Sequence, residues 1–421
     1  MKIDTIFISS YTYIKDGIRT NGSGPVLPLI NYFSTNKVAN QTTVLEQPLP
    51  GSDYLTPIIS IYKENDLKAK ISSKITLTLG KKTKSFNSNK TYFRLKVRDL
   101  LSNLVLLPRA YRLNNKKKFN LFIGVESINA ICGIIAKKLG FVDTVIYYIF
   151  DWSPNRYPNP LVNKLYILLD KFATYYSDAT WNITYAIADA RLNILKFNKD
   201  KMSPQIYVPY SPEFDEKYFY DVNSINTNLI IYAGGLIPEN GVELLIDAFK
   251  LVVKQYPKAQ LSCIGGGEQE DYLKEKVTTC KLEHAINFTG YLSDEEEILK
   301  LQSKGCIGVA PYPVMEGTRK AFGDVIKIRM YFLSALVTVT TSVPPVSKEI
   351  QEENLGLVTS NDTPEALANS ILELLTNKEK LLIYRHNVIN KAKKSSWKHT
   401  YTNALNQMNL SKIQKSKGRK N

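Results

Sequence analysis

LIIYAGGLIPENGVELLIDAFKLVV, residues 229–253, is the part of the chain with the clearest structural pattern. LIIYA predicts a short buried strand, Gly234–Gly235 predicts a turn, and apolar residues then recur at helical spacing as far as Val253. Strand, glycine turn and helix follow again in AQLSCIGGG, DYLKEKVTTCKL and INFTGYL, between residues 259 and 292. This alternation predicts a parallel sheet covered on both faces, with ligand positions at the carboxyl ends of its strands.

The amino-terminal half carries the same alternation less regularly. IDTIFIS, NLFIGV and TVIYYIF predict buried strands, and SINAICGIIAKKLG predicts a helix that ends at Gly140. Residues 209–228 are rich in Pro, Asn, Asp and Ser and predict a linker. We therefore expect an α/β protein with two Rossmann-like doubly wound domains. The expected segments are residues 1–208, a linker over 209–228, residues 229–395, and a carboxyl-terminal helix and basic tail over 396–421.

Positive charge is concentrated in two segments of the chain. The 421 residues have a formal net charge of +16, residues 63–118 hold 16 Lys or Arg against three acids, and residues 387–421 hold nine Lys or Arg and no acid. Such segments suit the phosphates of anionic lipid or of nucleic acid. The charge is not interleaved with a base-stacking motif, and no HTH or RRM signature is present, which argues against a nucleic-acid partner.

Within the first basic segment, KVRDLLSNLVLLPRAYRL (residues 96–113) predicts a helix with two interpretations. An apolar stripe beside Lys and Arg is typical of a helix that lies on an anionic membrane surface. A helix that packs the stripe into the core and exposes a basic side fits equally well. The stripe consists of Val97, Leu100, Leu101, Leu104 and Val105.

The sequence predicts neither a membrane span nor a metal site. The most apolar region, residues 129–150, is interrupted by Lys137, Lys138 and Asp143. The four cysteines lack metal-ligand spacing, and the amino terminus lacks the features of a signal peptide. We therefore expect a cytoplasmic protein with reduced cysteines and no bound metal.

Three glycine-rich turns, at Gly234–Gly235, Gly265–Gly267 and Gly290, follow predicted strands. Glycine lets backbone N–H groups approach a phosphate or a base closely, and a helix start behind the turn adds its dipole. Each turn alone is weak evidence, because strand-to-helix geometry by itself requires glycine more often than not, but several such turns line one edge of the sheet. GGGEQED lacks the GxGxxG spacing and no Walker P-loop is present, so we expect a nucleotide that is bound in another way.

A series of motifs resembles the nucleotide-sugar domain of family-four glycosyltransferases, which have the two-Rossmann GT-B fold. The resemblance covers about residues 229–375 and rests on the order and spacing of IIYAGGLIPENGVELLIDAF, LSCIGGGEQEDYL, INFTGYLSDEEEILKL, GCIGVAPYP and DVIKIRMYFLSALVTVTT. The amino-terminal half resembles the acceptor domain more loosely, through NGSGP and VIYYIFDWSP, and Trp397 resembles the tryptophan that opens the final, crossing helix. The family implies two domains that face each other across a cleft, and sugar transfer from a nucleotide diphosphate to an acceptor without a bound metal.

The resemblance also implies roles in donor binding. Gly234 and Gly235 would lie beside the diphosphate, and the helix that starts near Val325 would point its amino end at the phosphates. The loop PVMEGTRKAFGD, residues 313–324, would meet the sugar. Gly265, Gly266 and Gly267 would turn below the nucleotide, and Tyr291 and Leu292 would offer backbone groups to the base.

The chain departs from the family at three donor contacts. Gly235 and Asn240 replace an arginine and a lysine, and Met330 replaces the glutamate that holds the ribose hydroxyls, for which a thioether is only a weak substitute. Asp324, one of the nearest acids, is predicted at the donor but fits equally as the N-cap of the helix that follows. We expect the missing positive charge to come from Arg319, Lys320 and Lys327.

Many relatives have a histidine followed by an aspartate where this chain has Phe150 and Asp151. A retaining transfer does not need that histidine, because the leaving phosphate can take the acceptor proton. Asp151 fits equally as the cap of the turn SPNRYP, and Trp152 and Arg156 fit equally as loop packing. We predict Asp151, Glu316 and Lys327 as catalytic residues, and Gly22, Gly24, Trp152 and Arg156 as acceptor-binding residues.

The expected function is that of a retaining, metal-independent hexosyltransferase in polysaccharide or glycoconjugate synthesis. Its donor substrate would be a nucleotide-diphosphate sugar, with no further cofactor, and its acceptor a glycan or a lipid-linked glycan. The expected location is the cytoplasm or the inner face of the membrane. The three departures leave a second hypothesis open, a catalytically silent sugar- or nucleotide-binding subunit of a glycan-assembly complex.

Overall fold

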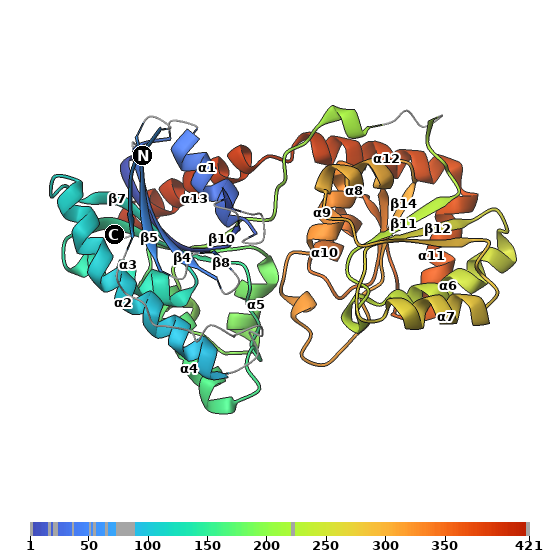
Figure 1. Cartoon of the computed structure of the whole chain (residues 1–421), viewed down its shortest axis with the longest axis horizontal. Helices are drawn as coiled ribbons and strands as arrows, with labels where there is room; N and C mark the ends of the chain where they lie inside the picture. Colours follow the sequence, from blue (N-terminus) through green and yellow to red (C-terminus); the bar gives the residue numbers. More distant parts are fainter. Residues whose placement is uncertain are drawn as a thin grey trace. The chain divides into compact units, whose positions relative to one another are not determined.

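The computed structural model describes residues 3–15, 18–19, 24–35, 38–49, 52–53, 56–63, 66–72, 89–219 and 224–417. The chain divides into two compact units (Figure 1). The amino-terminal unit comprises Met1–Pro209 and Trp397–Asn421, and the carboxyl-terminal unit comprises Tyr210–Ser396. The expected α/β class with two Rossmann-like domains is confirmed.

The amino-terminal unit contains an eight-stranded sheet with the order β10-β9-β8-β7-β1-β4-β5-β6. Its parallel strands are β1 (Ile3–Thr12), β4 (Ala39–Pro48), β7 (Phe119–Val125), β8 (Val142–Ile149), β9 (Ala179–Asn182) and β10 (Gln205–Tyr207). The antiparallel strands β5 (Ile58–Lys63) and β6 (Asp66–Ser72) extend one edge, and they add to the parallel sheet that the sequence predicts. A separate hairpin pairs β2 (Ile14–Lys15) with β3 (Ile18–Arg19).

Helices cover both faces of this sheet (Figure 1). One face carries α1 (Val26–Thr35) and α13 (Trp397–Lys417), and the other carries α2 (Asn89–Leu113), α3 (Ser127–Lys138) and α4 (Pro160–Tyr176), with α5 (Tyr185–Asn193) against β9. The rings of Trp397 and Trp181 both stack on Tyr401, whose hydroxyl donates to the Pro25 carbonyl at 2.9 Å. These contacts hold the final helix on the amino-terminal unit.

The carboxyl-terminal unit contains a six-stranded parallel sheet with the order β13-β12-β11-β14-β15-β16. The strands are β11 (Leu229–Ala233), β12 (Gln260–Ile264), β13 (Ile286–Gly290), β14 (Ile307–Ala310), β15 (Val337–Thr340) and β16 (Gly356–Val358). The helices are α6 (Val242–Gln255), α7 (Glu270–Thr279), α8 (Glu295–Gln302), α9 (Ile326–Leu333), α10 (Val346–Glu352), α11 (Pro364–Thr376) and α12 (Lys378–Lys393). The strand order reverses between β11 and β14, which is the position where open α/β sheets bind ligands.

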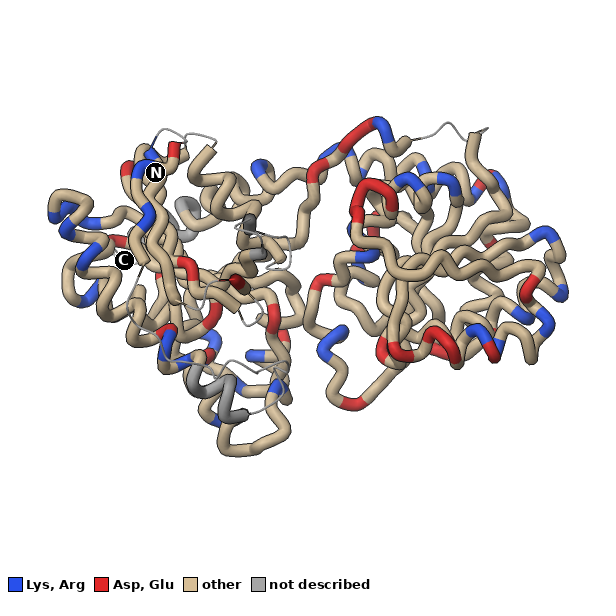
Figure 2. Tube along the Cα trace, in the orientation of Figure 1, with Lys and Arg blue, Asp and Glu red and all other residues tan. Residues whose placement is uncertain are grey.

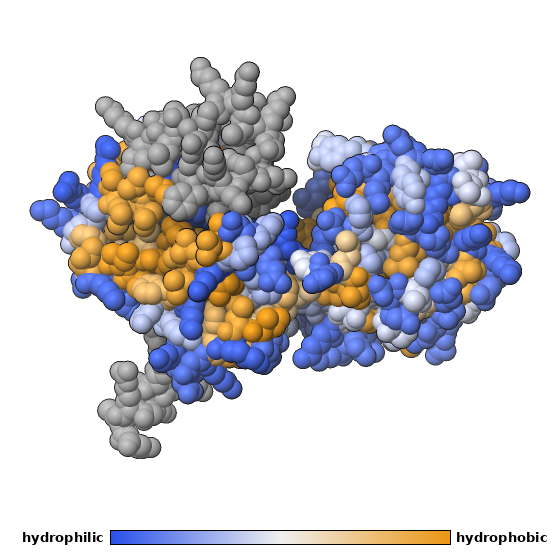
Figure 3. All heavy atoms as spheres, turned by 90° about the horizontal axis from the view of Figure 1, so that it is seen from below, coloured by the Kyte–Doolittle hydropathy of each residue, from blue (hydrophilic) through white to orange (hydrophobic). Residues whose placement is uncertain are grey.

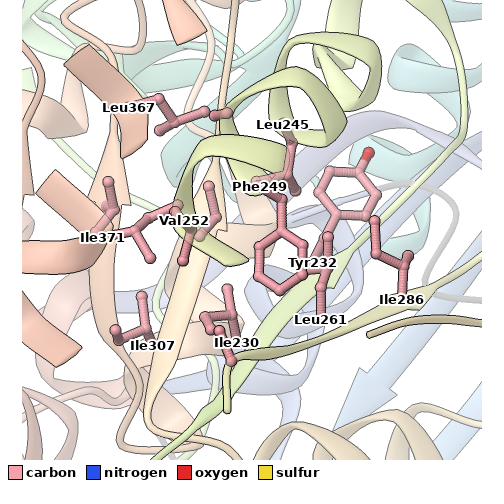
Figure 4. Packing of buried hydrophobic residues seen from close by; sticks show 14 of the residues in the cluster. Ile230, Tyr232, Leu245, Phe249, Val252, Leu261, Ile286, Ile307, Leu367 and Ile371 are labelled. Carbon is pink, nitrogen blue, oxygen red and sulfur yellow. The ribbon is translucent and has the colours of Figure 1, made fainter. Parts of the chain in front are cut away.

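The core of this unit fixes the turn that follows β11. Leu245, Phe249 and Val252 of α6 pack against Ile230 of β11 and Ile371 of α11 (Figure 4). The predicted helical spacing over residues 242–253 is therefore confirmed, because the apolar positions of α6 are its buried ones. As a result, β11 and α6 are held rigidly at both ends of the segment from Gly234 to Gly241.

The carboxyl-terminal unit begins at Tyr210, so it includes most of the segment 209–228 that the sequence predicts as a linker. The Tyr210 amide donates to Asp324 at 2.8 Å, and the Ser395 hydroxyl donates to the Pro212 carbonyl at 2.7 Å. Among the described residues, no helix is long and apolar enough to cross a membrane, and no three His, Cys, Asp or Glu side chains are grouped so that they could hold a metal ion.

Candidate functional site

The glycine turns of the carboxyl-terminal unit meet at the carboxyl edge of its sheet. Gly234 follows β11, Gly265 follows β12, and Gly290 ends β13, so the three positions lie on neighbouring strands. The Gly265 amide donates to the Gly290 carbonyl at 3.1 Å, and the Gly234 amide donates to the Ile264 carbonyl at 2.9 Å. The turns are therefore linked to one another, next to the reversal of strand order between β11 and β14.

Two of these glycines are required by close approach of the backbone. Gly265 has φ +134, and a Cβ atom there would lie 2.2 Å from the Gly234 carbonyl oxygen. A Cβ atom on Gly267 would lie 2.4 Å from the Leu236 carbonyl oxygen. Packing alone thus explains Gly265 and Gly267, whereas Gly235 has no neighbour closer than 3.6 Å to a built Cβ.

Lys327 brings a positive charge to the first of these turns. It lies in the first turn of α9, its ammonium donates to the Tyr232 hydroxyl at 3.1 Å, and it lies 4.2 Å from the centroid of the Tyr232 ring. A Cβ atom built on Gly234 would come within 2.9 Å of its Nζ atom. Burial lowers the pKa of Lys327 well below its usual value, and the nearby charge of Lys320 lowers it further. No carboxylate among the described residues forms an ion pair with Lys327, so this cation is left for an external anion.

Lys320 shares this environment with Lys327. Both ammonium groups lie over the Tyr312 ring, at 5.5 Å for Lys320 and 5.1 Å for Lys327. The pKa of Lys320 is lowered chiefly by its burial. Two lysines therefore meet over one aromatic ring just beyond the end of β14, which is an arrangement that an anion would stabilise.

Backbone donors surround the two lysines. In the first turn of α9, the amides of Ile326 and Lys327 have no acceptor among the described residues, whereas the Ile328 amide donates to the Val325 carbonyl at 3.0 Å. First-turn amides point along the helix axis toward its amino end. No described residue accepts a hydrogen bond from the Gly235 amide. These N–H groups and the two lysines together form a set of hydrogen-bond donors that suits a phosphate.

Asn240, which stands where the family resemblance expects a lysine, is used by the fold. Its side-chain amide donates to the Gly235 carbonyl at 2.8 Å, and the Tyr232 hydroxyl donates to the same oxygen at 2.7 Å. The next residue, Gly241, has φ +70, and a Cβ atom there would lie 1.8 Å from the Pro311 carbonyl oxygen. Asn240 and Gly241 thus shape the turn and add no positive charge to it.

Asp324 is buried in a network of ion pairs, with its side chain 1% exposed. It accepts from Arg329 Nε at 3.0 Å, and Arg329 also pairs with Glu349 at 2.9 Å. Burial raises the pKa of Asp324, against the opposite effect of Arg329. The N-cap alternative for Asp324 is wrong, because α9 is preceded by Val325 and has no side-chain cap. Its carboxylate joins the Tyr210 segment to α9, and its predicted role in donor binding stays a prediction.

Met330 points into an apolar cluster, which is why it cannot replace a ribose-binding glutamate. It is 7% exposed and packs with Tyr218, Leu299, Leu333 and Ala392. The preceding Arg329 is used in the pairs with Asp324 and Glu349. The structure therefore uses the Met330 position for packing of α9.

The remaining predicted donor residues are more exposed. Tyr291 is 78% exposed, and its Cβ lies 3.3 Å from a Cβ atom built on Gly266, so the turns after β12 and β13 adjoin there. Arg319 and Glu316 are exposed on the segment that follows β14, and Leu292 is partly buried. The structure thus brings Lys320 and Lys327 together but shows no bond from Glu316 or Arg319 to either of them. The roles of these exposed residues stay predictions.

In the amino-terminal unit, Asp151 and Arg156 form an ion pair at 2.5 Å after β8. Arg156 also donates to the Asp151 carbonyl at 2.8 Å, so the pair closes the turn between them. The Trp152 indole is 1% exposed and lies 5.7 Å from the guanidinium of Arg191, which pairs with Asp170 in the interior. Of the two interpretations of Trp152, loop packing therefore fits the structure, because the buried ring cannot stack on a sugar. Gly24 has φ +60 in the turn before α1, and Gly22 lies outside the described residues.

Glu126 is a candidate that the sequence analysis missed. It follows β7, has φ +70 and ψ 161, and is 8% exposed. Only glycine adopts this backbone region readily, so a glutamate held there is strained, and such strain is concentrated at functional sites. Burial raises the pKa of Glu126, while Lys96 and Arg156 oppose that rise. A lone acid directly after the buried run NLFIGV was the available signal in the sequence.

The two-unit fold is the GT-B fold, which solved structures of glycosyltransferases share. Sucrose-phosphate synthase from Thermosynechococcus elongatus matches with a TM-score of 0.65 over 98% of this chain and 99% of its own, at 13% identity. HepE of Anabaena, in complex with UDP, matches with a TM-score of 0.60 over 96% of this chain and 100% of its own, at 15% identity. At these identities the likeness establishes the fold.

Residues 216–395, which are less than half of the chain, match the family model described as "Glycosyl transferases group 1". Mannosylfructose-phosphate synthase of Agrobacterium fabrum (strain C58) is 30% identical over 104 residues, which are 20% of this chain and 23% of that relative. The match thus spans about a quarter of the relative's length. The expected resemblance to GT-B glycosyltransferases is therefore confirmed.

Proposed function

We propose that this chain transfers a sugar from a nucleotide-diphosphate sugar to a hydroxyl group of a glycan or a lipid-linked glycan, with retention at the anomeric carbon. The observation that carries the proposal is Lys327, a partly buried cation that has no carboxylate partner among the described residues and lies against Gly234. The structure of HepE in complex with UDP supports a nucleoside diphosphate as the anion.

In the proposed reaction, the bond between the anomeric carbon and the diphosphate oxygen breaks, and negative charge grows on the leaving diphosphate. Lys327, Lys320 and the first-turn amides of α9 stabilise that charge, because they are held in place before the reaction begins. The acceptor oxygen bonds to the anomeric carbon, and its proton passes to the leaving diphosphate. No side chain of the donor site needs to act as a base in this scheme.

On the acceptor side, we assign Glu126 to a hydroxyl of the acceptor. Its carboxylate is buried at the carboxyl end of β7, where β7 and β1 are neighbours and lead to strands on opposite sides of the sheet. Asp151 and Arg156 lie after the adjacent strand β8 and affect the same carboxylate electrostatically. Peripheral association with the inner face of a membrane is part of the proposal, in line with a lipid-linked acceptor.

A thermal-shift screen against UDP-, GDP-, ADP- and dTDP-sugars tests the donor first. A ligand at 100 times its Kd should stabilise the protein by about 2.7 kcal/mol, so one matching donor should stand out. Incubation of that donor with lipid-linked and free glycans, followed by proton NMR of the new linkage, then tests transfer and its stereochemistry. An inverted product would contradict retention, and a screen without any stabilising nucleotide sugar would contradict the donor site.

The second candidate is a catalytically silent nucleotide-sugar-binding subunit, and the packing of Met330 and Asn240 favours it. Neither side chain is available to a donor, since Met330 lies in an apolar cluster and Asn240 bonds to the Gly235 carbonyl. Both candidates predict donor binding, and only the first predicts turnover. Calorimetric binding of a donor, with no sugar transfer in any acceptor mixture, would favour the silent subunit.

A further inference from the structure

The outer face of α4 is apolar and exposed. Leu161, Leu165 and Leu168 are 79%, 46% and 61% exposed, and Phe172 and Tyr176 continue the row at 37% and 56%. Residues spaced three or four apart lie on one side of a helix, so these side chains form a continuous stripe. Apolar residues gather on this side of the amino-terminal unit in the space-filling view (orange in Figure 3).

The stripe continues over the two neighbouring helices. Leu104 and Val105 of α2 are 46% and 55% exposed, and Leu139 at the end of α3 is 65% exposed. Helix α3 packs beside both α2 and α4. We call the exposed apolar side chains of α2, α3 and α4 the apolar platform. Contiguous apolar surface of this kind marks an interaction site.

The inner face of α2 carries the polar residues Arg98 and Asn103 beside the buried apolar Leu107. Arg98 donates to the Pro48 carbonyl at 2.9 Å, and Asn103 donates to the Asn129 side chain at 2.9 Å, both within the interior. Because this polar network occupies the inner face, Leu104 and Val105 are left on the outer face. The interpretation in which the whole apolar stripe of this helix packs into the core is therefore wrong for these residues. A helix in this orientation suits an outer surface that meets an apolar phase.

The exposed charged residues on the three helices of the platform have one sign. Arg109, Arg112 and Lys164 are exposed on these helices, and Lys and Arg recur along α2 (blue in Figure 2). The acids of the three helices, among their described side chains, are Asp99 and Asp170, and both are 0% exposed and paired with arginines. A second copy of the chain on this surface would bring like charges together, whereas anionic lipid headgroups complement them.

We propose that the apolar platform docks the amino-terminal unit on an anionic lipid bilayer. The apolar side chains of α2, α3 and α4 enter the boundary between headgroups and acyl chains, and Arg109, Arg112 and Lys164 contact the lipid phosphates. The inference adds a specific surface to the proposed membrane association and does not rest on sugar transfer.

Vesicle flotation of the full chain tests the proposal without any nucleotide sugar. Vesicles of phosphatidylglycerol and phosphatidylcholine in equal parts should bind the protein, and vesicles of phosphatidylcholine alone should bind it at least about tenfold more weakly. The double variant Leu161→Gln/Leu168→Gln should weaken binding to the anionic vesicles by about tenfold or more. Both side chains are largely exposed, so the variant should keep the fold, which circular dichroism and thermal unfolding check.

Ile383→Gln is the matched control, since Ile383 is 53% exposed on α12 of the carboxyl-terminal unit, and it should leave vesicle binding unchanged. The proposal is overturned if the wild-type chain does not float with anionic vesicles, or if the double variant floats as well as the wild type. Sedimentation velocity of the wild type and the double variant is an independent test, because it measures whether the chain forms a dimer. A dimer of the wild type that the double variant abolishes would identify a second copy as the occupant and would also overturn the proposal.

Discussion

Replacement of Lys327 by methionine should weaken donor binding while leaving the unliganded protein at least as stable. Methionine keeps an unbranched side chain and removes the charge that lies 4.2 Å from the Tyr232 ring centroid and 5.1 Å from that of Tyr312. A hydrogen bond from a charged donor contributes about 1.5–3 kcal/mol, so the Kd for a nucleoside diphosphate should rise roughly tenfold to a hundredfold. Calorimetric titration with the nucleoside diphosphate measures this directly, and Lys254→Met, an exposed lysine on α6, is the control.

The same variant should also differ from the wild type in its free energy of unfolding, in a direction that a merely structural lysine would not give. Because the pKa of Lys327 is lowered in the folded state, its charged form costs free energy at low pH, and the cost fades as the pH rises through the folded pKa. The free energy of unfolding of Lys327→Met should therefore exceed that of the wild type at low pH, and the difference should shrink with rising pH. Urea unfolding at several pH values measures it. An unchanged Kd, or a variant that is less stable at every pH, would refute the role of Lys327 as a cation kept for an anion.

Four further predictions follow from particular residues. Above its lowered pKa, Lys327 is neutral in the free protein, so donor binding should be coupled to proton uptake and the affinity should fall with rising pH. Calorimetry in two buffers of different ionisation enthalpy should show less proton uptake for Lys327→Met. Glu126→Gln should raise the KM for the acceptor while the Kd for the donor stays unchanged, and an effect on donor binding alone would contradict its acceptor role. Gly241→Ala should lower the free energy of unfolding by more than about 2 kcal/mol, because the backbone is strained there and the new Cβ atom would clash with the Pro311 carbonyl. Gly317→Ala has a similar φ but no neighbour within 4 Å, so it should lower the free energy of unfolding by only about 1–2 kcal/mol. Lys281→Gly, at an exposed position with φ 57 after α7, should raise the free energy of unfolding by about 1 kcal/mol, and a decrease in urea unfolding would contradict this.

Local patterns were sufficient to predict the parallel sheets and the glycine turns. Alternating apolar runs and glycines depend on neighbours in the sequence, and the strands from β11 to β15 lie where those patterns place them. The prediction that lysines replace the missing donor cations also has structural support, since Lys320 and Lys327 meet over Tyr312. Lys320 lies in the segment after β14, and Lys327 lies at the start of α9. The order of strands and helices brings both to the same edge of the sheet, and that order was predictable from the sequence.

The direction of individual side chains was not predictable from the sequence. Asp324 stands where an N-cap is expected, but Arg329 and the Tyr210 amide bind its carboxylate. Trp152 follows a predicted strand end, yet Arg191, distant in the sequence, covers its ring. The antiparallel strands β5 and β6 depend on pairing with the edge of β4, which no local pattern encodes. In each case the outcome is decided by a contact between residues far apart in the chain.

The outward orientation of α2 has a similar explanation. Its apolar stripe fits a core and a membrane equally in the sequence. In the structure the inner face is occupied instead by Arg98 and Asn103, together with Leu107 of the core. The apolar row on α4 is also exposed, with Leu161 at 79%, and the sequence analysis made no prediction for this segment. The position of such a helix relative to the sheet has to be known before its apolar face can be assigned.

The most direct test of the donor site is a crystal structure with the nucleoside diphosphate that the thermal-shift screen selects. We predict that its diphosphate lies within about 3 Å of Lys327 Nζ and of the Gly235 amide, at the amino end of α9. A diphosphate bound elsewhere on the chain, with Lys327 left without an anion, would contradict the account.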